Sequence, residues 1–349
     1  MPPKILFIDS THPILPEMLK QHGFEVDYFP ELKKSDYLTL LPDYFGIIIR
    51  SKFRLDKDFL KHATNLKFIG RQGAGMENID LIYAASRGVL CLNSPEGNRD
   101  ALGEHALGML ISLFNHFRAA DQQVRQGVWD REGNRGLEIK GKTIGIIGYG
   151  NMGSAFAQRL KGFECRIIAY DKYKSGFGNE WVEEVSMHEL LTLADVVSLH
   201  IPLTEETTYL VDKDFINSFS KSFYLINTAR GKNVKTADLV EALQSGKIVG
   251  ACLDVLEYED MNFEGMMSVD KPSFDSAQDD NDSAQDDNLA QSPSRHFAQS
   301  PLRPIALTTL LSCENVLLTP HIAGFSAESK IKLAQILGEK IIQNFSNPA

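Results

Sequence analysis

Short β-rich runs alternate with helix-like stretches along most of this 349-residue chain, and this alternation strongly limits the folds that it can adopt. It is typical of parallel α/β architecture, because parallel strands need long crossover connections. Runs such as 46–49 and 144–147 are apolar throughout, as expected of strands covered on both faces. The sequence therefore predicts two doubly wound parallel sheets. The expected strands are Lys4–Asp9, Phe24–Phe29, Phe45–Arg50, Leu66–Gly70, Val89–Asn93, Thr143–Ile147, Cys165–Asp171, Val196–His200, Ser222–Asn227, Ile248–Val255 and Asn315–Thr319.

A glycine-rich turn predicts a dinucleotide site in the second half of the chain, and so a Rossmann-like domain there. The turn follows one expected strand, opens a helix and has the G-x-G-x-x-G spacing that lets backbone N–H groups approach a pyrophosphate. Asp171 ends the next strand and suits the ribose hydroxyls of NAD rather than the phosphate of NADP, although Lys172 and Lys174 weaken this preference. A strand–turn–helix without a ligand is the alternative. The residues of the turn are Gly148, Tyr149, Gly150, Asn151, Met152 and Gly153.

Two helices are expected to join the halves. A long helix over about 101–126 is apolar on most of its faces, so it should be buried, either in the core or against a second copy of the chain. An amphipathic helix over 326–345 is expected to pack back on the first domain.

The alternation stops over residues 262–312, where short polar repeats follow one another. Such a segment cannot bury enough apolar area to offset its ordering entropy. It is expected to be a disordered or weakly ordered surface insertion, with a binding segment as the alternative.

Composition excludes several classes of function. The net charge of −10 disfavours nucleic acid as a partner, and the chain has neither a long apolar run nor a signal sequence that would predict a membrane location. Four scattered cysteines predict no metal site or disulfide framework and suit a reducing, cytoplasmic compartment.

Polar side chains stand near the ends of three expected strands of the nucleotide half: Arg230, Glu259 and His321. The carboxyl ends of parallel strands face the ligand crevice, so these three predict an acid–base and anion-binding site. Taken singly, each has a plainer explanation: a surface ion pair, a solvated acid and a core histidine.

The chain resembles the D-isomer-specific 2-hydroxyacid dehydrogenase family, in particular its phosphoglycerate dehydrogenase branch. The resemblance covers about 1–261 and 313–349 and rests on five motifs. It implies a substrate domain over 1–98 and 322–349, with an NAD-binding domain over 99–321 inserted between them. The helix near 101–126 resembles the dimerisation element, which implies a homodimer. The motifs are Gly73–Asp80, the glycine turn, Asn227–Gly231, Ala251–Glu259 and Thr319–Gly324.

The resemblance implies a role for each motif residue. Arg230 binds the substrate carboxylate and keto oxygen, His321 is the acid–base, and Glu259 pairs with the histidine and favours its protonated form. Asp254 lies near the nicotinamide, and the backbone of Ala74 and Gly75 holds the substrate carboxylate. Further cofactor contacts are expected at His200, Pro202, Thr228 and Ala229, and contacts to a substrate phosphate at Arg50 and Arg71.

The expected reaction is therefore the NAD-dependent interconversion of a small, anionic D-2-hydroxy acid and its 2-keto acid, with 3-phosphoglycerate as the first substrate to try. A hydroxypyruvate or glyoxylate reductase is the alternative within the same chemistry. An NAD-sensing binding protein, like the corepressors that resemble this family, is the alternative from another class. Deleting 270–303 would distinguish the enzyme from the binding protein. If turnover survives the deletion unchanged, that segment is dispensable for the reaction.

Overall fold

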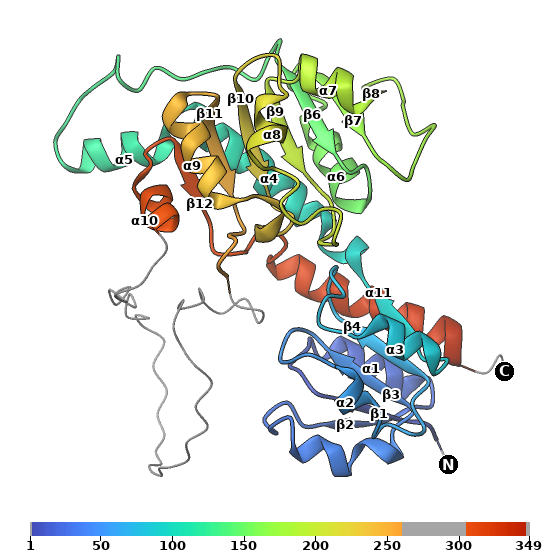
Figure 1. Ribbon diagram of the computed structural model, residues 1–349. Coiled ribbons are helices and arrows are strands. Elements are labelled where there is room, and N and C mark those ends of the chain that lie inside the picture. The colour runs from blue at the N-terminus through green and yellow to red at the C-terminus, as the bar shows by residue number, and fades with distance from the viewer. Residues whose placement is uncertain (1, 260–304, 347–349) are drawn as a thin grey trace.

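The computed structural model describes residues 2–259 and 305–346, and these form two parallel sheets (Figure 1). The first sheet has the strand order β2-β1-β3-β4-β5 and the second β12-β11-β10-β9-β6-β7-β8. Every strand pair in both sheets is parallel, which confirms the predicted fold class. The strands are β1 Lys4–Phe7, β2 Glu25–Tyr28, β3 Gly46–Ile49, β4 Phe68–Arg71, β5 Leu90–Asn93, β6 Thr143–Ile147, β7 Arg166–Tyr170, β8 Val182–Glu184, β9 Val196–Leu199, β10 Phe223–Asn227, β11 Ile248–Leu253 and β12 Val316–Leu318.

Helices cover both sheets. β3 is buried along its whole length, and four of the five residues of β6 are buried, as the continuous apolar runs predict. The α-helices are α1 Ile14–Gln21, α2 Lys57–Leu60, α3 Leu81–Ser86, α4 Arg99–Phe114, α5 Phe117–Arg125, α6 Asn151–Leu160, α7 Met187–Leu193, α8 Lys213–Asn217, α9 Thr236–Ser245, α10 Ile305–Ser312 and α11 Ala327–Phe345. Four short 3₁₀ helices are η1 Asp36–Thr39, η2 Leu41–Asp43, η3 Pro95–Gly97 and η4 Gly231–Asn233.

The C-terminal helix α11 packs on the five-stranded sheet, beside α1 and η3 (Figure 1). Its residues Ala334, Leu337 and Ile341 are fully buried in the core of that sheet. The helix begins with a capping box, in which the Ser326 side chain accepts a hydrogen bond from the Ser329 N–H. Both ends of the described chain therefore belong to the five-stranded domain, and the seven-stranded domain lies between them in sequence.

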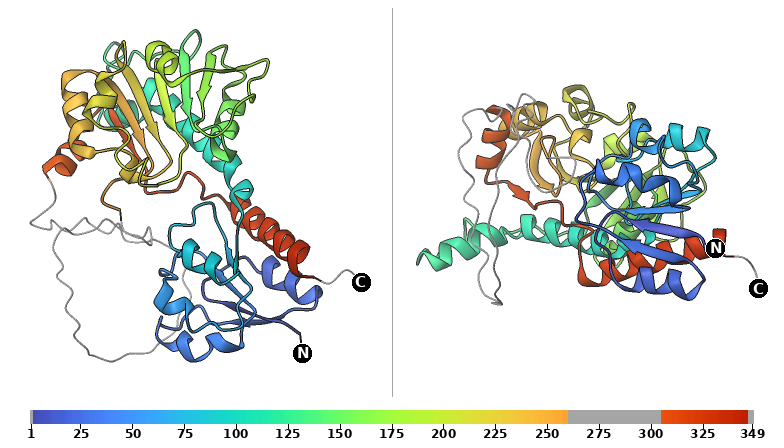
Figure 2. Two further views of the ribbon diagram at one scale, coloured as in Figure 1. Left: turned by 45° about the vertical axis from the view of Figure 1, so that its right-hand side comes forward. Right: turned by 90° about the horizontal axis from the view of Figure 1, so that it is seen from below.

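The single helix expected over 101–126 is wrong, because the chain turns between α4 and α5. His116 has φ 52, in the left-handed region, and separates the two helices. α4 is buried against α6. No residue of α5 is buried, and Figure 2 shows this helix projecting from the body. Burial in the core of this chain therefore fails for α5, where the Phe117 side chain is 55% exposed, and contact with a second copy stays a prediction.

Two further differences concern short elements. Residues 305–312 belong to the range expected to be a weakly ordered insertion, but they form helix α10, whose Leu307 and Leu310 are buried. The rest of that range, up to residue 304, lies outside the described residues. The edge strand β8 was not predicted, because three residues are too few to show a periodic pattern.

The two domains are also joined by ion pairs around the start of α4. Asp100 accepts from Arg159 on α6 at 2.9 Å and from Lys332 on α11 at 3.1 Å. Glu96 in η3 pairs with Lys340 on α11 at 2.8 Å. These contacts tie the C-terminal helix and the seven-stranded domain to the segment that connects the sheets.

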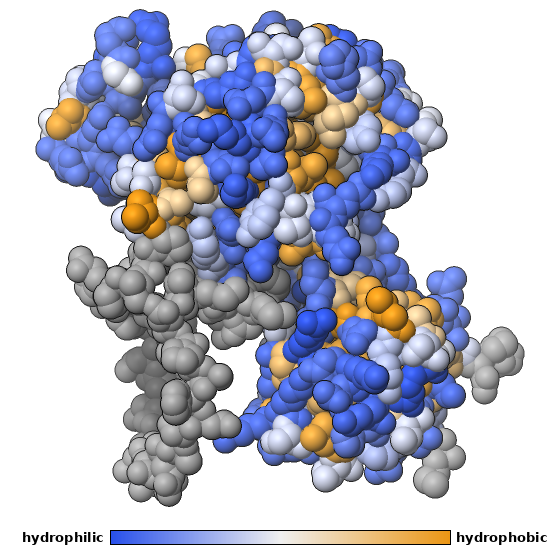
Figure 3. Space-filling view, viewed as in Figure 1, coloured by the Kyte–Doolittle hydropathy of each residue, from blue (hydrophilic) through white to orange (hydrophobic). Residues whose placement is uncertain are grey.

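The outer surface is mostly hydrophilic on the face drawn in Figure 3. A few apolar residues gather near α3, where Leu81 and Ile82 are exposed. No helix among residues 2–259 and 305–346 is long and apolar enough to cross a membrane.

Candidate active site

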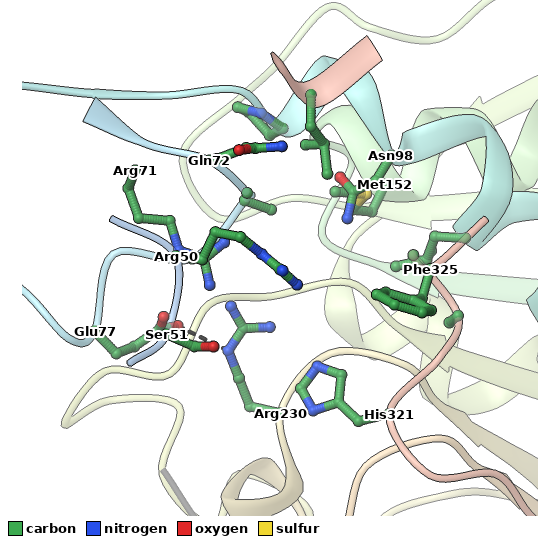
Figure 4. Close-up of a pocket in the computed structure, with 18 of the residues that line it drawn as sticks. Arg50, Ser51, Arg71, Gln72, Glu77, Asn98, Met152, Arg230, His321 and Phe325 are labelled. Carbon is green, nitrogen blue, oxygen red and sulfur yellow. Dashed lines mark hydrogen bonds and ion pairs between the residues drawn. The ribbon is translucent and has the colours of Figure 1, made fainter. Parts of the chain in front are cut away.

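A cavity of about 1040 Å³ lies where the carboxyl ends of strands from the two sheets face each other. Arg50 follows β3 and Arg71 ends β4 in the five-stranded sheet, and Arg230 and His321 follow β10 and β12 of the seven-stranded sheet. All four side chains line the cavity, and Figure 4 shows His321 beside Arg230 with the guanidinium groups gathered next to them.

His321 and Glu259 meet although 62 positions separate them in the sequence. The Nδ1 atom of His321 lies 2.9 Å from a carboxylate oxygen of Glu259, and both side chains are largely buried. His321 has φ 55, a strained conformation for a residue other than glycine, and its N–H donates to the Asp254 carbonyl at 2.7 Å. The backbone therefore turns the imidazole toward the cavity while the carboxylate holds its far nitrogen.

Asp254 anchors the loop that carries His321. The Asp254 side chain is buried, and its two oxygens accept hydrogen bonds from the Ile322 and Ala323 N–H groups at 2.8 and 2.9 Å. The Thr319 hydroxyl donates to the same carboxylate at 2.6 Å, and His105 on α4 lies 3.1 Å from that hydroxyl. Asp254 also lines the cavity, so the residue expected near the nicotinamide has a structural task as well.

Arg230 is held by its own loop and by the opposite domain. Its N–H donates to the Asn233 side chain at 3.0 Å, and its Nη1 donates to the Ala229 carbonyl at 2.6 Å. Its Nε donates to Glu77 at 2.8 Å, across the cavity. Glu77 was missed by the sequence analysis, which treated Gly73–Asp80 only as a backbone motif.

Arg50 and Arg71 place two more positive groups beside Arg230. Burial, together with the charges of Arg230 and Arg50, lowers the pKa of Arg71 to about 10. The Asp9 carboxylate accepts three hydrogen bonds from the backbone N–H groups of residues 50–52 and so fixes the loop that carries Arg50. This side of the cavity is therefore built to receive negative charge.

The loop 73–75 lies against these side chains. Ala74 and Gly75 line the cavity, as the resemblance predicts for the residues that hold a substrate carboxylate. A Cβ atom on Gly75 would lie 2.1 Å from Arg230 Nη2, so the guanidinium stands directly on the glycine backbone.

The glycine turn packs so closely that side chains are excluded. A Cβ atom on Gly148 would lie 2.5 Å from the His200 carbonyl oxygen, and one on Gly153 would lie 2.0 Å from the Gly148 carbonyl oxygen. At Gly150 no atom lies within 4 Å of such a Cβ, which leaves room for a ligand above the turn. Asp171 accepts from the Tyr149 N–H at 2.8 Å and so joins the ends of β6 and β7.

Buried polar atoms without a protein partner also point to a ligand. In the described part of the chain, no hydrogen-bond partner reaches His200 Nδ1, Thr228 Oγ1 or Asn98 Oδ1, and all three residues line the cavity. Burial lowers the pKa of His200 to about 3, so its imidazole is neutral. Unpaired buried groups cost free energy unless a ligand satisfies them. These atoms and the close-packed turn fit a bound dinucleotide.

The predicted cofactor residues thus divide into two groups. Asn151, Met152, His200, Pro202, Thr228, Ala229 and Asp254 line the cavity. The others are not lining residues: Gly148, Tyr149, Gly150 and Gly153 belong to the same turn as Asn151 and Met152, and Asp171 follows β7 and accepts from Tyr149. The two groups form a continuous path from the cavity to the end of β7.

Other residues that line the cavity carried no sequence signal, among them Asn98 and Phe325. Asn98 precedes α4, and Phe325 follows the histidine motif and is 71% exposed with its ring at the cavity (Figure 4). Among the described residues, no group of three or more His, Cys, Asp or Glu side chains could hold a metal ion.

The fold and the site define a class of two-domain α/β proteins that hold a dinucleotide at the cleft between two parallel sheets. The NAD binding domain of the D-isomer specific 2-hydroxyacid dehydrogenase family matches residues 107–323, and the chain belongs to that family, which confirms the resemblance.

Relatives agree with this assignment. The chain is 30% identical over 341 residues to a D-3-phosphoglycerate dehydrogenase of Archaeoglobus fulgidus, covering 97% of this chain and 56% of the relative. It is 30% identical over 312 residues to a hydroxypyruvate reductase of Thermotoga maritima, covering 89% and 88%. The solved D-lactate dehydrogenase of Treponema pallidum is 25% identical, with a TM-score of 0.74 and coverage of 99% and 98%. The chain thus spans about half of the phosphoglycerate dehydrogenase and most of the reductase.

Proposed function

We propose that this protein is an NAD-dependent oxidoreductase that interconverts a small D-2-hydroxy acid and its 2-keto acid. One observation carries the proposal: Arg230 and His321, whose Nδ1 contacts Glu259, line one cavity that reaches the glycine turn at Asn151 and Met152. NAD, when bound, supplies or accepts the hydride. The other parts of the reaction, which are binding a carboxylate and moving a proton, fall to residues of the chain.

Arg230 and the loop 73–75 bind the substrate. A planar guanidinium can bind a carboxylate and the neighbouring keto oxygen at the same time. The keto oxygen then lies beside His321, which gives it a proton during reduction and removes the proton during oxidation. Glu259 contacts Nδ1 at 2.9 Å and so holds the imidazole in its orientation.

The first substrate to try is 3-phosphoglycerate, with 3-phosphohydroxypyruvate as its keto acid. Arg50 and Arg71 line the same cavity as Arg230, which suits a substrate with a second anionic group. A reductase for hydroxypyruvate or glyoxylate is the second candidate, favoured by the relative from Thermotoga maritima, which this chain matches over most of its length.

An NADH-oxidation screen tests the proposal. The full chain is mixed with NADH and with 3-phosphohydroxypyruvate, hydroxypyruvate, glyoxylate, pyruvate or 2-oxoglutarate, and the absorbance of NADH is followed. We expect turnover of at least one keto acid, with the highest kcat/KM for 3-phosphohydroxypyruvate. NADH binding without turnover of any of them would contradict the proposal and would favour an NAD-sensing protein.

We further propose a homodimer formed through α4, α5 and the segment that follows them. Five apolar side chains of α5 and the segment after it are exposed, and a second copy of the chain would cover them. Light scattering of the wild type should give twice the chain mass, and Trp129→Asp should lower that mass. The exposed apolar residues are Phe117, Val124, Val128, Trp129 and Leu137.

We also propose a cytoplasmic location, which agrees with the four free cysteines.

A further inference from the structure

Glu77 and Arg230 form an ion pair that crosses the cavity between the two domains. Glu77 lies in the loop after β4 of the five-stranded sheet, and Arg230 lies between β10 and η4 of the seven-stranded sheet. The Arg230 Nε donates to Glu77 Oε1 at 2.8 Å, and the side chains of Arg230 and Glu77 are 21% and 35% exposed (Figure 4).

Each nitrogen of the Arg230 guanidinium has its own neighbour, and Glu77 takes the Nε side. Nε faces Glu77 and Nη1 faces the Ala229 carbonyl at 2.6 Å, while Nη2 stands against the backbone of Gly75. The Glu77 carboxylate reaches the same place, since a Cβ on Gly75 would lie 2.1 Å from its Oε2. Two fixed contacts on different nitrogens prevent the guanidinium from rotating about its long side chain.

The charges around the pair explain why a carboxylate is needed to keep the Arg230 guanidinium in place. Arg50 and Arg71 repel Arg230, and a flexible guanidinium would move away from them toward solvent. Burial raises the pKa of Glu77, but the charge and hydrogen bond of Arg230 outweigh it, so the pKa is below its ordinary value and the carboxylate is ionised. Glu77 thus offsets the repulsion where the three arginines approach one another.

We propose that Glu77 is a positioning residue, which holds Arg230 by its Nε edge so that the guanidinium faces a 2-keto acid beside His321. The inference rests on the proposed function. It predicts that loss of Glu77 weakens the binding of the substrate carboxylate and slows the reaction. NADH binding should be unchanged, because Glu77 belongs to the five-stranded domain and the glycine turn to the seven-stranded one.

Three variants separate the parts of this role. Glu77→Ala removes both contact and charge, and we expect kcat/KM for the best keto acid to fall about 30-fold, through a higher KM and a lower kcat. Glu77→Gln keeps an oxygen that can accept from Nε and should lose less than Glu77→Ala. Glu25→Gln is the matched control, because Glu25 also pairs with a cation, Lys4, but lies outside the cavity; it should behave as wild type.

A double-mutant cycle tests whether Glu77 acts through Arg230. Arg230→Lys removes the Nε edge that Glu77 holds, so adding Glu77→Ala to Arg230→Lys should cost less than twofold further. A purely structural role for Glu77 would instead give the same further loss of kcat/KM in both backgrounds and would also weaken NADH binding.

Binding of oxalate, a two-carbon dicarboxylate that imitates a 2-keto acid, provides a measurement that needs no turnover. Calorimetry in the presence of NADH should show binding to the wild type and at least tenfold weaker binding to Glu77→Ala. The proposal is overturned if Glu77→Ala matches the wild type, if it binds oxalate more tightly because Glu77 blocks Arg230, or if the wild type binds no oxalate. A failure of the proposed function is different: the wild type binds oxalate but turns over no keto acid.

Discussion

The two walls of the cavity are built on different principles. The wall from the seven-stranded domain consists of a close-packed glycine turn and of buried polar atoms that have no hydrogen-bond partner among the described residues. The wall from the five-stranded domain consists of long charged side chains at the end of β4 and in the loops after β3 and β4: Arg71, Arg50 and Glu77. Added bulk should therefore damage the first wall, and changes of charge should alter the second wall and leave the first intact.

The largest effect should come from Arg230, which reaches from the first wall to the second. Arg230→Ala removes the bidentate donor, and we expect kcat/KM for the best keto acid to fall by about 10³-fold, the order seen when a donor to a developing oxyanion is lost. NADH fluorescence titration should show unchanged cofactor binding. Weakened NADH binding in this variant would mean that the two walls are not separate.

Added bulk in the glycine turn should weaken NADH binding, which Arg230→Ala leaves unchanged. In Gly153→Ala, the new Cβ would lie 2.0 Å from the Gly148 carbonyl oxygen, so the turn must shift. We expect about 1–3 kcal/mol lower stability and NADH binding weakened by about tenfold or more. Gly162→Ala is the control, because no atom lies within 4 Å of its Cβ. Equal NADH affinity in both variants would contradict the role of close packing.

Charge on the second wall should decide between substrates. Arg50→Gln removes one charge-assisted contact, worth about 1.5–3 kcal/mol, so kcat/KM for 3-phosphohydroxypyruvate should fall about 10–100-fold. Glyoxylate, which has no second anionic group, should lose less than twofold. A uniform loss for both keto acids would show that Arg50 contributes to the fold and not to selectivity.

The smallest effect is on stability in acid. The pKa of Glu77 in the folded protein lies below its ordinary value of 4.5, because of the charge and hydrogen bond of Arg230. The pair therefore contributes stability above that pH and loses it as the pH falls through the pKa of the folded state. Thermal denaturation of wild type and Glu77→Gln should therefore differ at pH 7 and converge in strong acid. A difference in Tm that grows toward low pH would contradict this sign.

Patterns within single segments predicted much of the structure. Apolar runs located eleven strands, and the glycine spacing located the dinucleotide turn, because both depend on neighbouring residues. The break at His116 was not visible, since the left-handed conformation there belongs to a residue other than glycine. Helix α10 was hidden because its eight residues follow a long polar stretch.

Only those residues of the site whose roles follow from a single sequence motif could be predicted. Arg230, Glu259 and His321 stand near strand ends, so the sheet topology already suggested that they meet. Glu77 was not predictable in its role, because its partner lies 153 positions away on another sheet. Contacts between domains depend on how two sheets are oriented, and no local pattern records that orientation.

The acid–base assignment of His321 is the centre of this account, and NADH oxidation by His321→Asn tests it most directly. Asparagine tolerates the left-handed backbone of residue 321 but cannot transfer the proton. With the best keto acid, kcat should fall by about 10²–10⁴-fold while NADH and oxalate bind as in the wild type. A variant that retains wild-type kcat would contradict the account.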